Sequence, residues 1–147
     1  MTPQQKLEAD IKDAMKARDT QRLSTLRLLL GAVKNRRIEI GDELDEAEFL
    51  TIVQKAVKQR QDAAKQYRDG NREELAAKEE AEIEVLQSYL PEQASEEEIR
   101  AAVTAFVEGE GLSGPAAMGP TMKAMMAKFG GAADGQTISK IAREILT

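Results

Sequence analysis

The chain has 147 residues and a formal net charge of -5, with 41% hydrophobic, 32% charged and only 3% aromatic residues. It contains neither Cys nor His, which excludes disulfides, thiolate and imidazole metal ligands, and catalysis by a His general base. A composition this rich in charged and aliphatic residues favours helices over a β-sandwich, so we predict an all-α protein.

Two helices are predicted at the start of the chain. Thr2, Pro3 and Gln5 have the pattern of a capping box with Pro at the first helical position. The buried stripe of this first helix is expected to contain Leu7, Ile11, Ala14 and Met15. Asp19 should cap a second helix that ends at Gly41. Its apolar residues cover a wide arc, formed by Leu23, Leu26, Leu29, Leu30, Val33 and Ile40, with Leu28 well away from it. Such a helix is expected to be central in its bundle.

A long antiparallel hairpin is predicted next. A second capping box at 45–48 opens a helix that runs to about Arg68, and Gly70 ends it. Asn71 is expected to cap the following helix at once, which makes the connection tight. Inward positions of the first hairpin helix are predicted to be Phe49, Ile52, Val53, Ala56, Val57, Ala64 and Tyr67.

The hairpin register places charged residues inside the apolar stripes. Arg60 lies in the stripe of one helix, and Glu79 and Glu82 lie at about the same height in the stripe of the other. A charge there would cost several kcal/mol unless it is paired, so we predict an ion pair between Arg60 and Glu79 or Glu82. The alternative is that one edge of the hairpin is solvated at this height. Arg37 also lies on the apolar side of its helix and is a possible second donor.

The chain is expected to divide at Pro91, which cannot lie in a helix interior. We predict an N-terminal four-helix domain over residues 1–90, a hinge at 91–94 and a three-helix domain over 95–147. Ser95 and Glu98 form a capping box that opens the C-terminal domain. The first helix of that domain should bury Ile99, Val103, Phe106 and Val107, and its last helix should bury Ile138, Ile141, Ala142, Ile145 and Leu146.

The stretch 118–135 concentrates glycines and methionines. Its apolar stripe is expected to consist of Met118, Met122, Met125, Met126 and Phe129. Gly130 and Gly131 should stop this helix, and Asp134 should cap the last one. Methionines at helical spacing fill a core more often than they form an adaptive surface for partner helices, and both interpretations remain open.

No residue pattern indicates a metal site, a cofactor or a catalytic nucleophile. The acidic cluster at 42–48 lacks the alternating ligands and central Gly of a calcium loop, and no strand precedes the glycines at 109–119. Glu79 and Glu82 could be paired catalytic carboxylates, but the facing Arg60 favours a structural pair. No apolar run approaches the ~20 residues of a membrane span, and the N-terminus lacks a signal-peptide core. We therefore expect a cytoplasmic protein without a membrane or DNA partner.

Basic residues nevertheless offer candidate contacts to RNA phosphates. Lys123 and Lys128 flank the methionine stripe, and Lys140 and Arg143 share the exposed face of the last helix. On the second helix, Arg27 and Lys34 share a flank near Gly31, where a phosphate could approach the backbone. With few aromatics to stack on bases, such a surface would bind the phosphate backbone.

Two motifs and the N-terminal run make the whole chain resemble the YqeY-like proteins of the GatB/YqeY group. The C-terminal motif consists of Met118, Gly119, Met122, Gly131, Ala133, Asp134 and Gly135. It is preceded by Leu90-Pro91-Glu92-Gln93, and the run from Arg22 to Leu29 also fits. Their combination and order are specific, whereas any single piece is not.

The resemblance implies an all-helical fold and kinship with the tail domain of the B subunit of tRNA-dependent amidotransferase. That enzyme amidates Glu-tRNA or Asp-tRNA with glutamine, and its tail contacts tRNA, so family labels often read as carbon–nitrogen ligase with glutamine as amido-N-donor. The catalytic parts of that enzyme have no counterpart here. Members of this group commonly have a basic residue after the Met-Gly pair and around the glycine turn, where this chain has Pro120, Gly130 and Ala132. Lys123 and Lys128 are the basic residues that this chain keeps in the region.

Three functions are therefore carried forward. The first is a non-catalytic accessory protein that binds tRNA in translation-related amidation, with tRNA, an amidotransferase or other translation proteins as partners. The second is a helical adaptor that binds a partner protein and no RNA. The third is a stand-alone amidotransferase, which ranks last because the chain lacks a nucleophile and a base.

Overall fold

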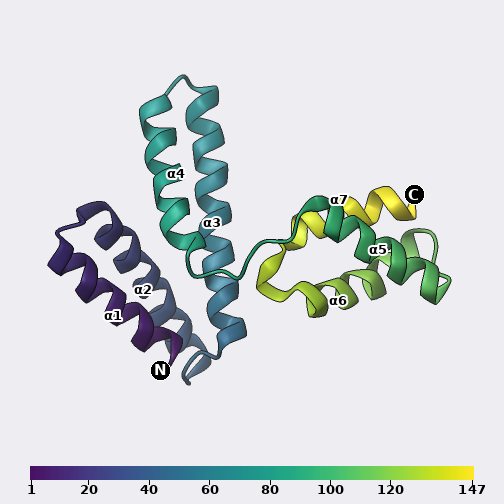
Figure 1. Cartoon of the computed structure of the whole chain (residues 1–147), viewed down its shortest axis with the longest axis horizontal. Coiled ribbons are helices and arrows are strands. Elements are labelled where there is room, and N and C mark those ends of the chain that lie inside the picture. The colour runs from purple at the N-terminus through teal and green to yellow at the C-terminus, as the bar shows by residue number, and fades with distance from the viewer. The chain divides into compact units, whose positions relative to one another are not determined.

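The computed structural model describes all residues from Met1 to Thr147, and it is entirely helical. The predicted all-α class is therefore confirmed. The chain divides into two compact units, Met1–Leu90 and Pro91–Thr147, which are described separately (Figure 1). The α-helices are α1 (Pro3–Ala17), α2 (Thr20–Ile40), α3 (Glu46–Asp69), α4 (Glu73–Gln87), α5 (Glu96–Glu110), α6 (Met118–Phe129) and α7 (Gly135–Leu146). Short 3-10 helices, η1 (Pro115–Ala117) and η2 (Gly130–Ala132), flank α6.

Side-chain caps set the start of most helices. At α1 both bonds of the capping box form, because Thr2 Oγ1 accepts from Gln5 N at 3.1 Å and Gln5 Oε1 accepts from Thr2 N at 2.9 Å. Capping by an acceptor side chain satisfies a backbone N–H that has no partner within the helix. The same role is played by Asp19 at α2, Asp45 at α3, Ser95 at α5 and Asp134 at α7. Each of these caps lies where the sequence predicted it.

The first unit is built from two helix pairs (Figure 1). α1 packs along α2, α3 packs along α4, and α2 also contacts both α3 and α4. The buried core shared by these helices is formed by Leu7, Ile11, Ala14, Leu26, Leu29, Val33, Leu44, Phe49, Val53, Val57, Ile83 and Leu86. α2 is therefore central in its contacts, as its wide apolar arc predicted.

Two predicted core residues of the first pair are nevertheless exposed. Met15 is 51% exposed and Ile40 is 38% exposed, so both expectations were wrong. Met15 lies near the end of α1 and Ile40 is the last residue of α2, where little chain remains to cover them. Thr25 takes a buried place instead, because its hydroxyl donates to Gln21 O at 3.1 Å and so needs no other partner.

The turn between α3 and α4 forms by a different mechanism from the predicted one. Asn71 adopts a left-handed φ of 60°, which Asn tolerates better than most residues, and it does not cap α4. Arg72 is the N-cap residue and its side chain makes no capping bond. Arg72 N donates to Tyr67 O at 2.7 Å, so the turn is closed through the backbone. The tight antiparallel hairpin follows all the same.

Tyr89 ties α1 to the chain that follows α4. Its hydroxyl donates to Asp10 Oδ2 at 2.6 Å, and its ring meets Phe49 edge-on at 5.9 Å between centroids. Lys6 Nζ lies 5.9 Å from the same ring centroid. Burial and the bond to Asp10 raise the pKa of Tyr89, so the hydroxyl stays protonated.

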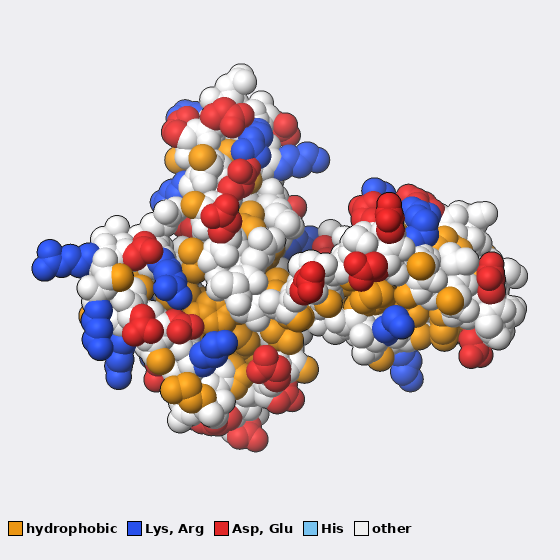
Figure 2. All heavy atoms as spheres, viewed as in Figure 1, with side chains coloured by type: hydrophobic (Ala, Val, Ile, Leu, Met, Phe, Trp, Pro, Cys, Tyr) orange, Lys and Arg blue, Asp and Glu red, His pale blue; other side chains and the backbone are white.

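The second unit packs α5, α6 and α7 around its own core. The buried residues are Ile99, Val103, Val107, Ala117, Met125, Ala133, Ile138, Ile141, Ala142 and Leu146. Larger half-buried residues surround them, namely Phe106, Leu112, Met118, Met122, Phe129 and Ile145. Figure 2 shows apolar side chains gathered where α6 meets the other two helices. Met126, at 42% exposed, is the one member of the predicted methionine stripe that faces solvent, beside Gly135.

Candidate functional site

The four basic side chains predicted on the last two helices are all exposed. Lys123 and Lys128 belong to α6, while Lys140 and Arg143 belong to α7. None of the four forms an ion pair with a carboxylate; Arg143 Nη2 only approaches Ser139 Oγ at 3.4 Å. We call Lys123, Lys128, Lys140 and Arg143 the α6/α7 cations.

The acidic residues of this unit lie mainly on α5. Glu96, Glu97 and Glu98 form the first turn of α5, where carboxylates are favoured by the helix dipole. On α7, Glu144 accepts from Arg100 Nη2 at 2.7 Å, and this bond lowers the pKa of Glu144. The only carboxylate within α6 and α7 is thus neutralised by α5, and the α6/α7 cations supply the remaining charge of these two helices.

The α6/α7 cations are spread over the surface and do not form one cluster. Lys123 and Lys128 are five residues apart, which places them about 140° apart around α6. Lys140 and Arg143 are three residues apart and lie about 60° apart around α7. A ligand that bridges them must therefore be extended and carry several charges, as a phosphate backbone does.

The glycine turn between α6 and α7 is held in place by the segment that precedes α5. Gly130 ends α6 with φ 53° and ψ -124°, a backbone conformation that favours glycine. Gln93 Nε2 donates to Gly131 O at 2.9 Å, and Ala94 N donates to Ala132 O at 2.8 Å. The two family motifs, one at 90–93 and one at 118–135, thus meet through these bonds. The sequence did not indicate this contact, because the bonded residues are 38 positions apart.

The remaining motif residues serve the local structure. Met118 and Met122 are half-buried in the core, and Gly119 is exposed in the first turn of α6. Asp134 Oδ1 accepts from Gln136 N at 3.0 Å and caps α7. A Cβ added to Gly135 would make ordinary van der Waals contact with Met126 Sδ at 3.6 Å, so space alone does not require glycine at this position.

Arg27 and Lys34 belong to the first unit and are exposed on α2. Neither forms an ion pair, and Gly31 between them has open space where a side chain would lie. Arg27 and Lys34 are thus a second pair of exposed cations without an ion-pair partner, in a different unit from the α6/α7 cations.

Charged residues inside the first unit hold its helices together. Of the two carboxylates expected to face Arg60, Glu82 forms the ion pair, with Arg60 Nε 3.1 Å from Glu82 Oε2. The Arg60 and Glu82 side chains are only 15% and 12% exposed. Burial and the Glu82 carboxylate raise the pKa of Glu79, although Arg60 opposes the shift. Arg37 instead pairs with Glu43 at 3.3 Å and donates to Gln4 at 3.2 Å.

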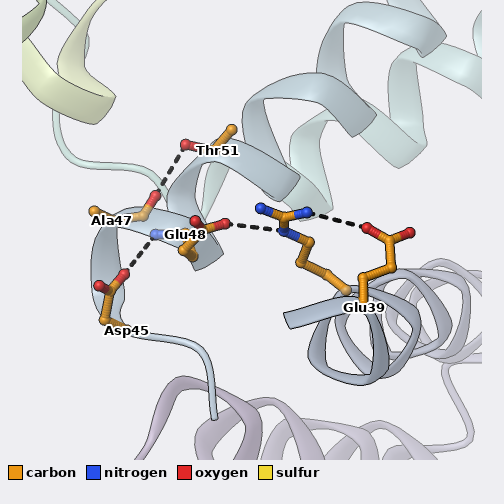
Figure 3. Close-up of polar contacts among 6 residues, drawn as sticks. Glu39, Asp45, Ala47, Glu48 and Thr51 are labelled. Atoms are coloured by element: carbon orange, nitrogen blue, oxygen red, sulfur yellow. Dashed lines mark hydrogen bonds and ion pairs between the residues drawn. The ribbon is translucent and has the colours of Figure 1, made fainter. Parts of the chain in front are cut away.

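Arg36 makes a further link that the sequence did not suggest. It donates to Glu39 of its own helix at 3.0 Å and to Glu48 of α3 at 3.2 Å, and these bonds raise the pKa of Arg36 (Figure 3). The N-cap Asp45 lies beside this link and accepts from Glu48 N at 2.8 Å. These contacts join α2 to α3, and the arrangement is a structural tie, because each of the three carboxylates takes part in a cap or an ion pair.

No group of three or more potential metal ligands occurs in the structure. None of the helices is both long and apolar enough to cross a membrane.

Comparison with known proteins shows sequence similarity to one family over nearly the whole chain. A family model described as Yqey-like protein matches residues 4–146. The protein named altered inheritance of mitochondria protein 41, mitochondrial, is 38% identical over 104 residues in Vanderwaltozyma polyspora, covering 69% of this chain and 56% of the relative. Its namesake in Lachancea thermotolerans is 40% identical over 101 residues, covering 67% and 54%. The one in Pyrenophora tritici-repentis is 28% identical over 144 residues, covering 96% and 79%.

This chain thus spans little more than half the length of the first two of these relatives. The family match itself extends over both units, from the first turn of α1 to the last turn of α7. The chain therefore belongs to the YqeY-like family.

Proposed function

We propose that the protein is a non-catalytic accessory protein that binds tRNA through phosphate contacts from the α6/α7 cations. The observation that supports this proposal most is that Lys123, Lys128, Lys140 and Arg143 are exposed and form no ion pair, although the chain as a whole is acidic. Exposed Lys and Arg side chains displace the counterions condensed on the phosphates of RNA, and the release of these counterions drives binding without base recognition. All five aromatic side chains are buried or half-buried, so base stacking contributes little.

A link to tRNA-dependent amidation belongs to the same proposal. It is supported by the resemblance to the tail domain of the amidotransferase B subunit, and it makes an amidotransferase or another translation protein the expected partner. The compartment is also proposed. The sequence favours the cytoplasm, whereas the names of the fungal relatives place those proteins in mitochondria. Either compartment would offer tRNA as a ligand.

The test is a titration of the full chain with unmodified tRNA at several salt concentrations. Binding should weaken by roughly 0.7–0.9 log units per phosphate contact for each tenfold rise in salt. The variant Lys123→Gln, Lys128→Gln, Lys140→Gln, Arg143→Gln removes four charges and should lose most of the affinity and most of this slope.

A matched variant removes four exposed lysines of the first unit, namely Lys12, Lys16, Lys55 and Lys65, and so has the same net charge. It should keep the affinity within about twofold if binding is local to α6 and α7. Equal losses in the two variants would mean that tRNA binding follows the net charge alone. Absence of tRNA binding at low salt would end the proposal.

A further inference from the structure

We infer that the exposed face of α2 is a docking surface for an acidic amphipathic helix of a partner protein. The residues concerned are Ser24, Leu28, Gly31, Asn35 and Ile38, here called the α2 seam. They follow one another at spacings of four, three, four and three residues, and all five are exposed. Leu28 is 58% and Ile38 79% exposed, among the highest values for large apolar side chains here.

The seam lies opposite the core face of the same helix. The core side of α2 contains Thr25, Leu26, Leu29 and Val33, which are all buried. A helix that packs on one side only needs polar residues on its other side. α2 instead carries a second stripe with an average spacing of 3.5 residues, which is the spacing that keeps residues facing a single partner helix.

The middle residue of the seam, Gly31, permits close approach of another helix. A Cβ placed on Gly31 would meet no atom within 4 Å, so the backbone of α2 is accessible there. Asn35 adds one polar group in the seam, which is a common way to fix the register of a helix pair. Leu28 and Ile38, about 15 Å apart along the helix, would be the two apolar anchors.

Charge along one edge of the seam determines the chemistry of the partner. Arg27 and Lys34 are seven residues apart, the repeat distance of flanking positions in a helix pair. A hollow of about 400 Å³ lies beside Arg27 and Leu28, and another of about 490 Å³ lies beside Lys34 and Ile38. The hollow beside Arg27 contains no carboxylate, whereas the one beside Lys34 also contains Arg37, Asp42 and Glu43, and Glu43 is already paired with Arg37. A helix with apolar residues in the seam and carboxylates along the edge that faces Arg27 and Lys34 would contact both cations.

The same charges argue against a second copy of this chain as the occupant. Antiparallel pairing of two α2 seams about Gly31 would bring the Arg27–Lys34 edge of one helix against the same edge of the other. Like charges at these flanking positions disfavour such a pair. A partner helix rich in Glu or Asp meets no such repulsion.

The test uses a fluorescent synthetic helix of about three heptads with Leu at seam positions and Glu along its edges, and a matched helix with Lys in place of Glu. Anisotropy titrations with the full chain should show tighter binding of the Glu helix than of the Lys helix. Leu28→Glu with Ile38→Glu should weaken binding of the Glu helix at least tenfold. Arg27→Glu with Lys34→Glu should reverse the preference toward the Lys helix.

Met15→Glu serves as the control, because Met15 is a 51% exposed apolar residue on α1 outside the seam, and it should leave binding unchanged. The inference is overturned if the wild type does not prefer the Glu helix, or if Met15→Glu weakens binding as much as the seam variant. It is also overturned if the chain is a dimer that Leu28→Glu dissociates, because the seam would then bind a second copy. A third contrary result is that Arg27→Glu with Lys34→Glu abolishes tRNA binding and leaves the preference between the two peptides unchanged.

Discussion

Replacing Glu82 by Gln should destabilise the α3–α4 hairpin, because it leaves the Arg60 guanidinium partly buried without its carboxylate. The two side chains are 15% and 12% exposed, and Arg60 Nε lies 3.1 Å from Glu82 Oε2. At an effective dielectric constant of about 20, this separation corresponds to an attraction of about 5 kcal/mol, much of which offsets the cost of desolvating the two ions.

Removing one partner of a fully buried pair costs about 3–5 kcal/mol. Here the residual exposure lets water reach Arg60, and Arg60 Nη1 still donates to Ala56 O at 3.0 Å. We therefore expect Glu82→Gln to lower the free energy of unfolding by about 2–3 kcal/mol. Chemical denaturation with urea, followed by circular dichroism, would measure this value.

The same substitution at an exposed pair provides the control. Glu144 accepts from Arg100 at 2.7 Å, but the two side chains are 46% and 48% exposed. Glu144→Gln should therefore cost less than about 1 kcal/mol. The double variant Arg60→Met with Glu82→Leu removes both charges and should regain most of the lost stability. If Glu82→Gln costs no more than Glu144→Gln, or if the double variant is less stable than Glu82→Gln, the reasoning from burial is refuted.

Four further substitutions test other parts of the structure by equilibrium unfolding. Burial raises the pKa of Glu79 above 4.5, so the charged carboxylate opposes folding. Glu79→Gln should therefore stabilise the protein at neutral pH. This gain should vanish below pH 4.5, where the Glu79 carboxyl is protonated in the folded and in the unfolded protein. Thr121→Val should be neutral or stabilising by up to about 1 kcal/mol, because the buried hydroxyl has no hydrogen-bond partner, and a clear loss would reveal a hidden one. Tyr89→Phe should cost about 1–2 kcal/mol by leaving half-buried Asp10 without its 2.6 Å bond, and an unchanged midpoint would contradict this. Gly130→Ala should cost about 1–3 kcal/mol, because φ 53° with ψ -124° strains any residue with a Cβ, and a stable Ala variant would show that the turn relaxes.

Local features of the chain could be predicted from the sequence because their causes lie within a few residues. The caps at Thr2 and Ser95 and the end of α2 at Gly41 depend on neighbours three or four positions away. The apolar spacing likewise identified most of the buried residues, since helical periodicity alone brings them to one face. The exposure of the α6/α7 cations follows from the same periodicity.

Contacts between distant residues were decided by the tertiary structure alone. Tyr89 bonds to Asp10 across 79 positions, and Gln93 bonds to Gly131 across 38, and neither residue type implies its partner. Arg36 was one of many arginines in the sequence until packing of α2 on α3 brought it to Glu48. The apolar spacing of α2 placed Leu28 outside the core arc, but the sequence did not show that the face containing Leu28 and Ile38 would stay uncovered. Its exposure depends on where α1, α3 and α4 pack against α2.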